Sequence, residues 1–238
     1  MVEQGVHHEL VGAVRAVLEQ HADPERAAGQ QRYMKSSMPY YGLTTPQHRQ
    51  VLGPLLSDPG LRMASRAQWE ATIEALWRGA THREEWYAAI ALARHRAYRG
   101  WVDSDAMPLW QSLIRRGAWW DVVDDIATHL VRDTVVAAPD VEGLRMREWA
   151  ADESLWVRRA AILSQIGVHD DRFDAELLTD VIEPNIDHPD FFSRKAIGWA
   201  LRDRARHDPG WVRSFVDSHP SLSGLSRREA LKHLGPLS

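Results

Sequence analysis

The sequence of 238 residues contains no cysteine, which excludes disulfide bonds and zinc sites built from thiolates. Its twelve histidines include no pair at the HExxH spacing, and no His/Asp set matches a metal site. A glycine-rich phosphate loop and a GxSxG nucleophile turn are also missing. These absences disfavour metalloenzymes and nucleotide-cofactor enzymes, and we predict that the protein uses no metal and no cofactor.

Long apolar runs are missing as well. No stretch approaches the roughly 20 apolar residues that a membrane-spanning helix needs, and residues 1–10 lack the apolar run of a signal peptide. We therefore expect a cytoplasmic protein with no membrane partner. Sustained alternation of apolar and polar residues is absent too, so strands are not expected.

A short phrase recurs instead, consisting of a bulky apolar residue followed by helix-forming positions. Successive copies lie 33 to 36 residues apart, and they begin at Trp86, Trp120, Trp156, Phe192 and Leu225. A period of this length is typical of stacked helical hairpins, because each unit buries its apolar face only against its neighbours. The period predicts one all-α solenoid of roughly six hairpins, forming a single domain over residues 1–238.

Start and stop signals of helices support this interpretation. Asp23 with Pro24 predicts a helix that runs to about Lys35, and Thr45-Pro46 predicts a second that runs to about Leu56. The pairs Thr81/Glu84 and Ser226/Glu229 have the spacing of a capping box. Each box lies at or just before a repeat phrase, which places the phrases in the first turns of helices.

The formal net charge is −4, which argues against a nucleic-acid partner because such domains are usually basic. Basic residues nevertheless recur three positions after the anchors, at Arg159, Lys195 and Arg228. If the hairpins stack, these positions form a stripe that suits a phosphate backbone. The alternative is that arginine and lysine simply coat exposed helix faces, and charge alone leaves both open.

One repeat position carries a candidate for chemistry. The fourth residue after the anchor is Ile90, Ala160 or Ala196 in three copies, but it is Asp124 in the second copy and Glu229 in the last. Trp120 precedes Asp124 by one helical turn, so both lie on one face. An aromatic ring beside a carboxylate suits a cationic ligand. The alternative is that Asp124 only forms a structural pair with Arg159.

The chain resembles the AlkD-type DNA alkylation repair glycosylases, which are built from HEAT-like repeats. Five segments in the family's order carry the likeness, and together they span nearly the whole chain. They are residues 23–25 through 32–35 with 42–46, Trp119–Asp124, Trp156–Leu163, Phe191–Arg202 and Leu225–His233. One departure is the pair Tyr40-Tyr41, where the family often has an apolar pair before the glycine. The resemblance implies a right-handed superhelix with a concave groove.

The resemblance also implies roles for single residues. Asp124 matches the family's catalytic carboxylate, Trp120 and Trp199 match its two tryptophans around the damaged nucleotide, and Tyr33 completes that aromatic set. From the spacing alone, a core tryptophan is the favoured interpretation of Trp199. Arg159 matches the arginine that holds the DNA backbone beside the lesion. The further DNA-binding residues that we predict are Arg158, Thr44, Thr45, Arg49, Arg194, Lys195 and Arg202.

The activity that the resemblance implies is excision of N3- and N7-alkylated purines, the first step of base excision repair. The partner would be double-stranded DNA containing such purines, and the enzyme a monofunctional hydrolase that acts without base flipping. Asp124 would stabilise the oxocarbenium-like sugar and position water. The alternative is a non-catalytic helical-repeat scaffold that binds DNA or protein. A monomer is expected, since capped ends close a solenoid.

Overall fold

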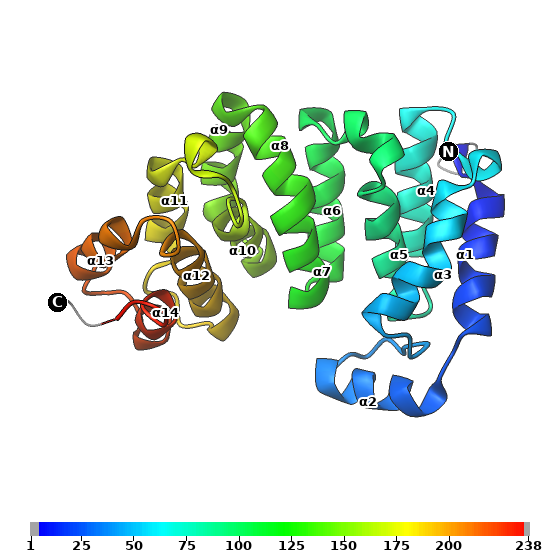
Figure 1. Cartoon of the computed structure of the whole chain (residues 1–238), viewed down its shortest axis with the longest axis horizontal. Helices are drawn as coiled ribbons and strands as arrows, with labels where there is room; N and C mark the ends of the chain where they lie inside the picture. Colours follow the sequence, from blue (N-terminus) through cyan, green and yellow to red (C-terminus); the bar gives the residue numbers. More distant parts are fainter. Residues whose placement is uncertain (1–4, 236–238) are drawn as a thin grey trace. The chain divides into compact units, whose positions relative to one another are not determined.

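The computed structural model describes residues 5–235, in which every regular element is helical. This confirms the all-α class. By its internal contacts the chain divides into two compact units, residues 1–101 and residues 102–238, which we describe separately (Figure 1). No helix among the described residues is both long and apolar enough to cross a membrane. The single domain over residues 1–238, the right-handed superhelix and its concave groove stay predictions.

The first unit packs its helices around one apolar core. Its elements are α1 (His8–Gln20), α2 (Pro24–Met34), α3 (Thr45–Ser57), η2 (Pro59–Leu61), α4 (Arg66–Arg78), α5 (Arg83–Ala93) and η3 (Arg96–Trp101). On α4 the spacing of Trp69, Ile73 and Leu76 places three apolar side chains on one face, and all three are fully buried. The helices expected after Asp23 and at Thr45 are confirmed as α2 and α3.

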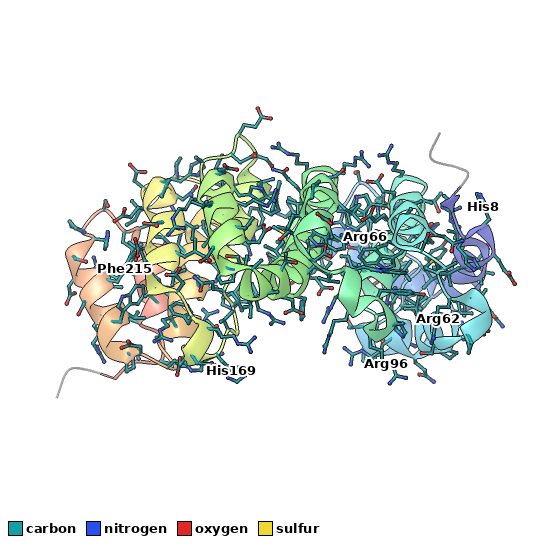
Figure 2. The ribbon with its side chains drawn as sticks, turned by 90° about the horizontal axis from the view of Figure 1, so that it is seen from above. His8, Arg62, Arg66, Arg96, His169 and Phe215 are labelled. Carbon is teal, nitrogen blue, oxygen red and sulfur yellow. The ribbon has the colours of Figure 1, made fainter. Side chains whose placement is uncertain are left out.

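Basic side chains also gather in this unit. Arg62 and Arg96 lie near His95, and Figure 2 labels both arginines. Burial and the positive charges of Arg96 and Arg62 lower the pKa of His95. The imidazole of His95 is therefore neutral at neutral pH.

The second unit is an array of packed helical hairpins. Its elements are η4 (Ser104–Ala106), α6 (Met107–Gly117), α7 (Trp120–Asp125), the π-helix η5 (Ile126–Val131), α8 (Arg132–Ala137), α9 (Pro139–Ala150), α10 (Leu155–Leu163), η6 (Asp170–Arg172), α11 (Ala175–Ile182), η7 (Glu183–Asn185), α12 (Phe191–Arg204), α13 (Pro209–Ser218) and α14 (Gly224–Ala230). Helix α10 packs against α7, α12 packs against α10, and α14 packs against α12. These four helices form an inner row in the second unit (Figure 1).

Each helix of the inner row begins with a copy of the repeat phrase. Trp120 is the first residue of α7, and Trp156, Phe192 and Leu225 are the second residues of α10, α12 and α14. The expected position of the phrase in the first helical turns is thus confirmed. The phrase therefore places the residues that follow it at equivalent positions of neighbouring helices.

The close approach of α14 to α12 depends on Gly198. A Cβ atom at this position would lie 2.5 Å from Cβ of Glu229 and 3.2 Å from the carbonyl oxygen of Ser226. Both atoms belong to α14, and neither is the free end of a flexible side chain. Any larger residue at position 198 would therefore push the last helix of the row away from α12.

Both expected capping boxes are wrong, because each helix has a different N-cap residue from the one expected. The N-cap of α5 is His82, and the hydroxyl of Thr81 donates to Glu85 (2.9 Å) instead of Glu84. Helix α14 begins earlier than expected, with Ser223 as its N-cap, and Glu229 turns toward α12. The spacing of a capping box recurs by chance in helical sequences, so it does not identify the cap when polar residues are adjacent.

Candidate active site

The Asp124 carboxylate and the Arg159 guanidinium group form a bidentate ion pair between α7 and α10. Nε of Arg159 donates to Oδ1 of Asp124 (2.7 Å), and an Nη atom donates to Oδ2 (2.8 Å). The other Nη atom donates to the carbonyl oxygen of Phe192 on α12 (2.6 Å). One arginine thus joins three consecutive inner helices, and its planar fork fixes the orientation of the carboxylate.

The pair is largely withdrawn from water. The Arg159 side chain is 5% exposed and the Asp124 side chain 16% exposed. Burial raises the pKa of Asp124, while the hydrogen bonds and the charge of Arg159 lower it, and the neighbouring charges of Asp121 and Asp125 raise it slightly. The result is a carboxylate that binds protons more readily than a surface aspartate and still faces solvent on one side.

A π-helix follows Asp124 directly and is an unusual backbone feature of the chain. The helical run that starts with α7 changes to the π form at Ile126 and returns to the α form at Arg132. Thr128, in the first turn of the π-helix, donates its hydroxyl to the carbonyl oxygen of Asp124 (2.8 Å). Single π turns occur often at functional sites because they change the direction of the preceding side chains. Sequence analysis gave no signal for this element.

An aromatic cluster packs beside the ion pair, and one of its three members differs from the expected anchor. The rings of Trp119, Trp156 and Phe192 meet pairwise, with centroids 5.0 to 5.7 Å apart. Trp119, which is partly exposed, therefore takes the place in this cluster that the repeat assigned to Trp120. The doublet Trp119-Trp120 carries no sequence signal that separates the two rings.

Trp120 and Trp199 are both partly exposed. Over residues 5–235, neither indole makes a ring contact or a hydrogen bond with another side chain. Trp120 lies one turn before Asp124 on α7. Trp199 lies on α12, and Arg159 connects α12 to Asp124 through its hydrogen bond to the carbonyl oxygen of Phe192. Two aromatic faces are therefore available to a ligand on helices that border Asp124.

The predicted basic stripe carries paired cations. Lys195 donates to Oε1 of Glu229 (2.9 Å), and Arg202 forms an ion pair with the other carboxylate oxygen of Glu229. Sequence analysis had not considered Glu229 as the partner of these residues. One carboxylate is thus shared by two of the predicted DNA-binding cations, which leaves a net charge of +1 in this cluster.

The other two predicted cations on α10 and α12 contact the loops that precede these helices. Arg158 donates to the carbonyl oxygen of Asp152 (2.6 Å) and to Nε2 of His188 (3.2 Å). Arg194 donates to the carbonyl oxygen of His188 (3.2 Å). Both side chains are half-buried, so they stiffen the start of α12 as well as carrying positive charge.

The remaining predicted residues belong to the first unit. Tyr33, near the end of α2, is 77% exposed. Thr45 and Arg49 are exposed on α3, whereas the hydroxyl of Thr44 caps that helix and contacts Gln47. These residues lie in the other compact unit from Asp124, so their place relative to the carboxylate stays a prediction.

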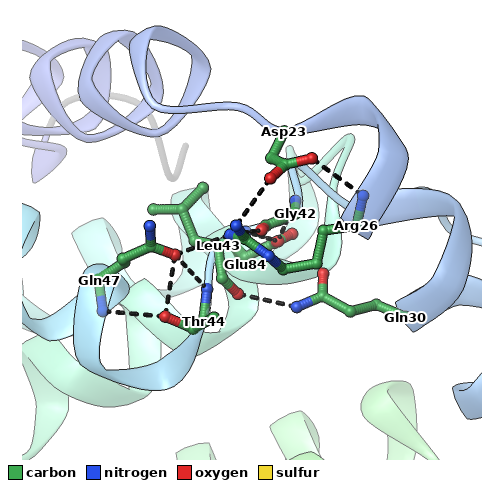
Figure 3. A network of polar contacts seen from close by, with 8 residues as sticks. All are labelled: Asp23, Arg26, Gln30, Gly42, Leu43, Thr44, Gln47 and Glu84. Atoms are coloured by element: carbon green, nitrogen blue, oxygen red, sulfur yellow. Dashed lines mark hydrogen bonds and ion pairs between the residues drawn. The ribbon is translucent and has the colours of Figure 1, made fainter.

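The loop before Thr44 is held by a buried carboxylate that sequence analysis missed. Glu84 is 1% exposed and accepts hydrogen bonds from the backbone N–H groups of Tyr41 (2.9 Å), Gly42 (2.8 Å) and Leu43 (3.2 Å). Gln30 donates to the carbonyl oxygen of Leu43 (2.9 Å), and Arg26 donates to the carbonyl oxygen of Gly42 (2.8 Å) (Figure 3). The first turn of α3 therefore starts from a rigid loop.

Gly42 is required within this loop. Its φ is +97°, which favours glycine, and a Cβ atom there would lie 2.2 Å from the carbonyl oxygen of Asp23.

Among the described residues no group of three or more histidine, aspartate or glutamate side chains is placed to hold a metal ion. The chemistry that the residues offer is therefore that of a carboxylate, aromatic faces and paired cations.

Two solved structures are similar to this chain to different degrees. A solved structure titled a predicted DNA alkylation repair enzyme from Enterococcus faecalis has a TM-score of 0.80 and 27% identity, covering 91% of this chain and 98% of its own. A second, the alkylpurine DNA glycosylase AlkC of Pseudomonas fluorescens bound to DNA containing an abasic site analogue, has a TM-score of 0.44 and 15% identity, over 98% of this chain and 63% of its own. A search of curated proteins finds no match.

The family comparison covers most of the sequence. The model of the DNA alkylation repair enzyme family matches residues 14–234, a range that includes α2, the Asp124–Arg159 pair and α12. The match includes every residue that sequence analysis assigned to the candidate site. The chain therefore belongs to the family of DNA alkylation repair enzymes.

Proposed function

We propose that the protein is a monofunctional DNA glycosylase that removes cationic N3- and N7-alkylated purines from double-stranded DNA. The observation that carries the proposal is the Asp124 carboxylate, which is mostly buried, is oriented by Arg159 and lies one turn from the partner-free ring of Trp120. A carboxylate in this setting suits the stabilisation of a positive charge that forms close to it. Family membership supports the substrate class.

The chemistry that fits this site is hydrolysis of an N-glycosidic bond. Alkylation at N3 or N7 places a positive charge on the purine, so the electron pair of the breaking C1′–N9 bond neutralises the base as it leaves. No acid is needed to protonate the base. The sugar develops oxocarbenium character, which the negative charge of Asp124 stabilises. Water then bonds to C1′ and gives a proton to the carboxylate or to solvent.

Burial of Asp124 assists the second part of this reaction. A carboxyl whose pKa is raised accepts a proton from water more readily at neutral pH than an ordinary aspartate does. Each carboxylate oxygen has two acceptor positions, and Arg159 occupies one on each oxygen. The other positions are available for the attacking water, which Asp124 orients toward the sugar.

Arg159 acts first as a positioning residue for Asp124. Three of its five N–H groups donate to Asp124 and to the backbone of Phe192. We propose that the remaining N–H groups contact the DNA backbone beside the lesion, together with Arg158, Arg194, Lys195 and Arg202. Trp120, Trp199 and Tyr33 contact the damaged nucleotide by their faces, without flipping the base into a pocket. Thr44, Thr45 and Arg49 contact the opposite strand.

An excision assay tests the proposal. The protein is incubated with a duplex that contains 7-methylguanine, and released base is measured by chromatography. Wild-type protein is expected to release the base, and Asp124→Asn is expected to lose most of the release while still binding the duplex. Asp121→Asn is the matched control, because it removes a neighbouring carboxylate of the same helix. Undiminished release by the Asp124 variant rejects the assigned role.

A non-catalytic scaffold is the second candidate, and two observations favour it. The cations Arg159, Lys195 and Arg202 all form ion pairs within the protein, and the net charge of the chain is −4. Both features weaken attraction to DNA. A scaffold predicts no base release from any alkylated duplex, whereas the glycosylase predicts release that depends on Asp124.

A further inference from the structure

Phe191 is an exposed aromatic residue that neither the repeat nor the family resemblance singled out as a contact. It is the first residue of α12, and its side chain is 58% exposed. Its ring contacts Phe192 edge-on, with centroids 5.5 Å apart. A single exposed phenylalanine is common on protein surfaces, so it is the position of Phe191 on α12 that indicates a contact.

The position of Phe191 on α12 relates it to the candidate active site. Phe191, Lys195, Trp199 and Arg202 are spaced by four, four and three residues, which places them in one stripe along the helix. The other three members of this stripe are those that the proposed function places against DNA. Phe191 extends the stripe by one turn toward the start of α12.

The start of α12 is held rigidly next to the Asp124–Arg159 pair. Asp190 caps the helix by accepting from the backbone N–H groups of Phe192 (2.7 Å) and Ser193 (3.3 Å). The carbonyl oxygen of Phe192 accepts from Arg159, which holds Asp124. The ring of Phe191 is therefore exposed while its backbone is fixed one residue from the group that orients the carboxylate.

We propose that Phe191 is a nucleotide-contacting residue whose ring stacks on a base next to the damaged nucleotide. This inference rests on the proposed function, since it takes DNA as the ligand of the stripe. An apolar ring offers no hydrogen bond and no charge, so it recognises the face of a base. In a duplex without base flipping, this face belongs to the neighbouring base and is open only on the side of the lesion. It holds the duplex in register while Asp124 contacts the sugar of the lesion.

The stacking contact has a measurable size. Alanine substitution of base-stacking aromatic residues weakens binding by about 5- to 150-fold. We expect Phe191→Ala to weaken binding of a duplex with a tetrahydrofuran abasic site by a factor in this range. Phe191→Trp is expected to retain the affinity, because it keeps an aromatic face, and Phe191→Leu is expected to fall between the two.

Salt dependence separates a stacking contact from an ionic one. The slope of log affinity against log salt should be unchanged in Phe191→Ala, because no counterion is released by a phenyl ring. Lys195→Ala is the comparison variant, with an expected decrease of the slope by about 0.9 for one phosphate contact. Leu144→Ala is the matched control, because it removes another exposed apolar side chain, 63% exposed on α9.

The outcomes distinguish this inference from the proposed function. If wild-type protein releases alkylated base and Phe191→Ala binds the abasic duplex like wild type, the stacking inference is wrong and the glycosylase stands. If affinity depends on the ring but no base is released, the contact stands and the proposed activity is wrong. Failure of the wild-type protein to bind either duplex overturns both. Melting curves by circular dichroism verify that each variant is folded.

Discussion

Replacing Arg159 with alanine tests the central ion pair most directly. The change removes a guanidinium group that is 5% exposed and leaves the Asp124 carboxylate, 16% exposed, without its partner. Removal of one partner from a buried pair destabilises proteins by about 3–5 kcal/mol. Because Asp124 keeps some contact with water, we expect a value near the lower end, about 3 kcal/mol.

The loss of stability can be measured by thermal unfolding. For a chain of this length, about 3 kcal/mol corresponds to a decrease in Tm of roughly 6–12 °C. Arg147→Ala is the matched control, because Arg147 joins α9 to α11 through Asp180 at 2.7 Å but both side chains are about one-third exposed. An exposed pair contributes about 0–1 kcal/mol, so the control should change Tm little.

A double-mutant cycle isolates the pair itself. Asp124→Asn and Arg159→Ala are each expected to leave one buried group unmatched, whereas the double variant leaves neither charge. The two effects should therefore be less than additive, with a coupling free energy of roughly 1–3 kcal/mol. Additivity within about 0.5 kcal/mol would refute the assignment of a structural and functional pair.

The pH dependence of base release provides a second readout. Burial raises the pKa of Asp124, and Arg159 is the group that lowers it. Loss of Arg159 therefore raises this pKa further, and since the ionised form is the active one, the acid limb of the rate profile moves to higher pH. Arg159→Lys retains one charge and should shift the limb less. A limb that does not move would mean that Arg159 has no influence on the carboxylate.

Two further changes test other charged groups. Glu229→Gln releases Lys195 and Arg202 from their shared partner, so DNA binding should tighten. The slope of log affinity against log salt should steepen by about 0.9 for each added phosphate contact. Glu183→Gln is the control, because it removes an equal charge at an exposed site and should leave this slope unchanged. Burial lowers the pKa of His48 below its usual value of 6.5, so the unfolded chain binds the proton more tightly. Stability should then fall as the pH decreases below 6.5, and urea unfolding of His48→Gln should show a flatter profile.

The arrangement of the inner helices was predictable because it follows from periodicity. Bulky residues at intervals of 33 to 36 positions begin α7, α10, α12 and α14, and a helix that buries one face must repeat its apolar side chains in this way. The same reasoning identified Asp124, since a carboxylate at a position that is apolar in the neighbouring copies is visible without coordinates. The family comparison agrees with the resemblance on which the residue roles were based.

Choices between adjacent residues were not predictable. Trp119 packs in the aromatic cluster while Trp120 keeps its ring apart, although a one-residue shift satisfies the repeat equally well. In the same way Glu84 binds the backbone of the preceding loop, whereas Glu85 takes the contact with Thr81. Side-chain direction on a helix changes by about 100° per residue, so such pairs are decided by tertiary packing. The π-helix after Asp124 has no sequence signal of this kind either.

The two acids of the repeat column show what coordinates add to the sequence. Asp124 and Glu229 occupy the same position after their anchors, and each pairs with a cation three positions after an anchor in a neighbouring copy, Arg159 in one case and Lys195 in the other. Glu229 holds a second cation, Arg202, and Lys195 together with Arg202 lowers its pKa. Burial raises the pKa of Asp124 instead. A proton acceptor for water at neutral pH needs the higher pKa and a free acceptor position, so of these two acids only Asp124 meets both conditions.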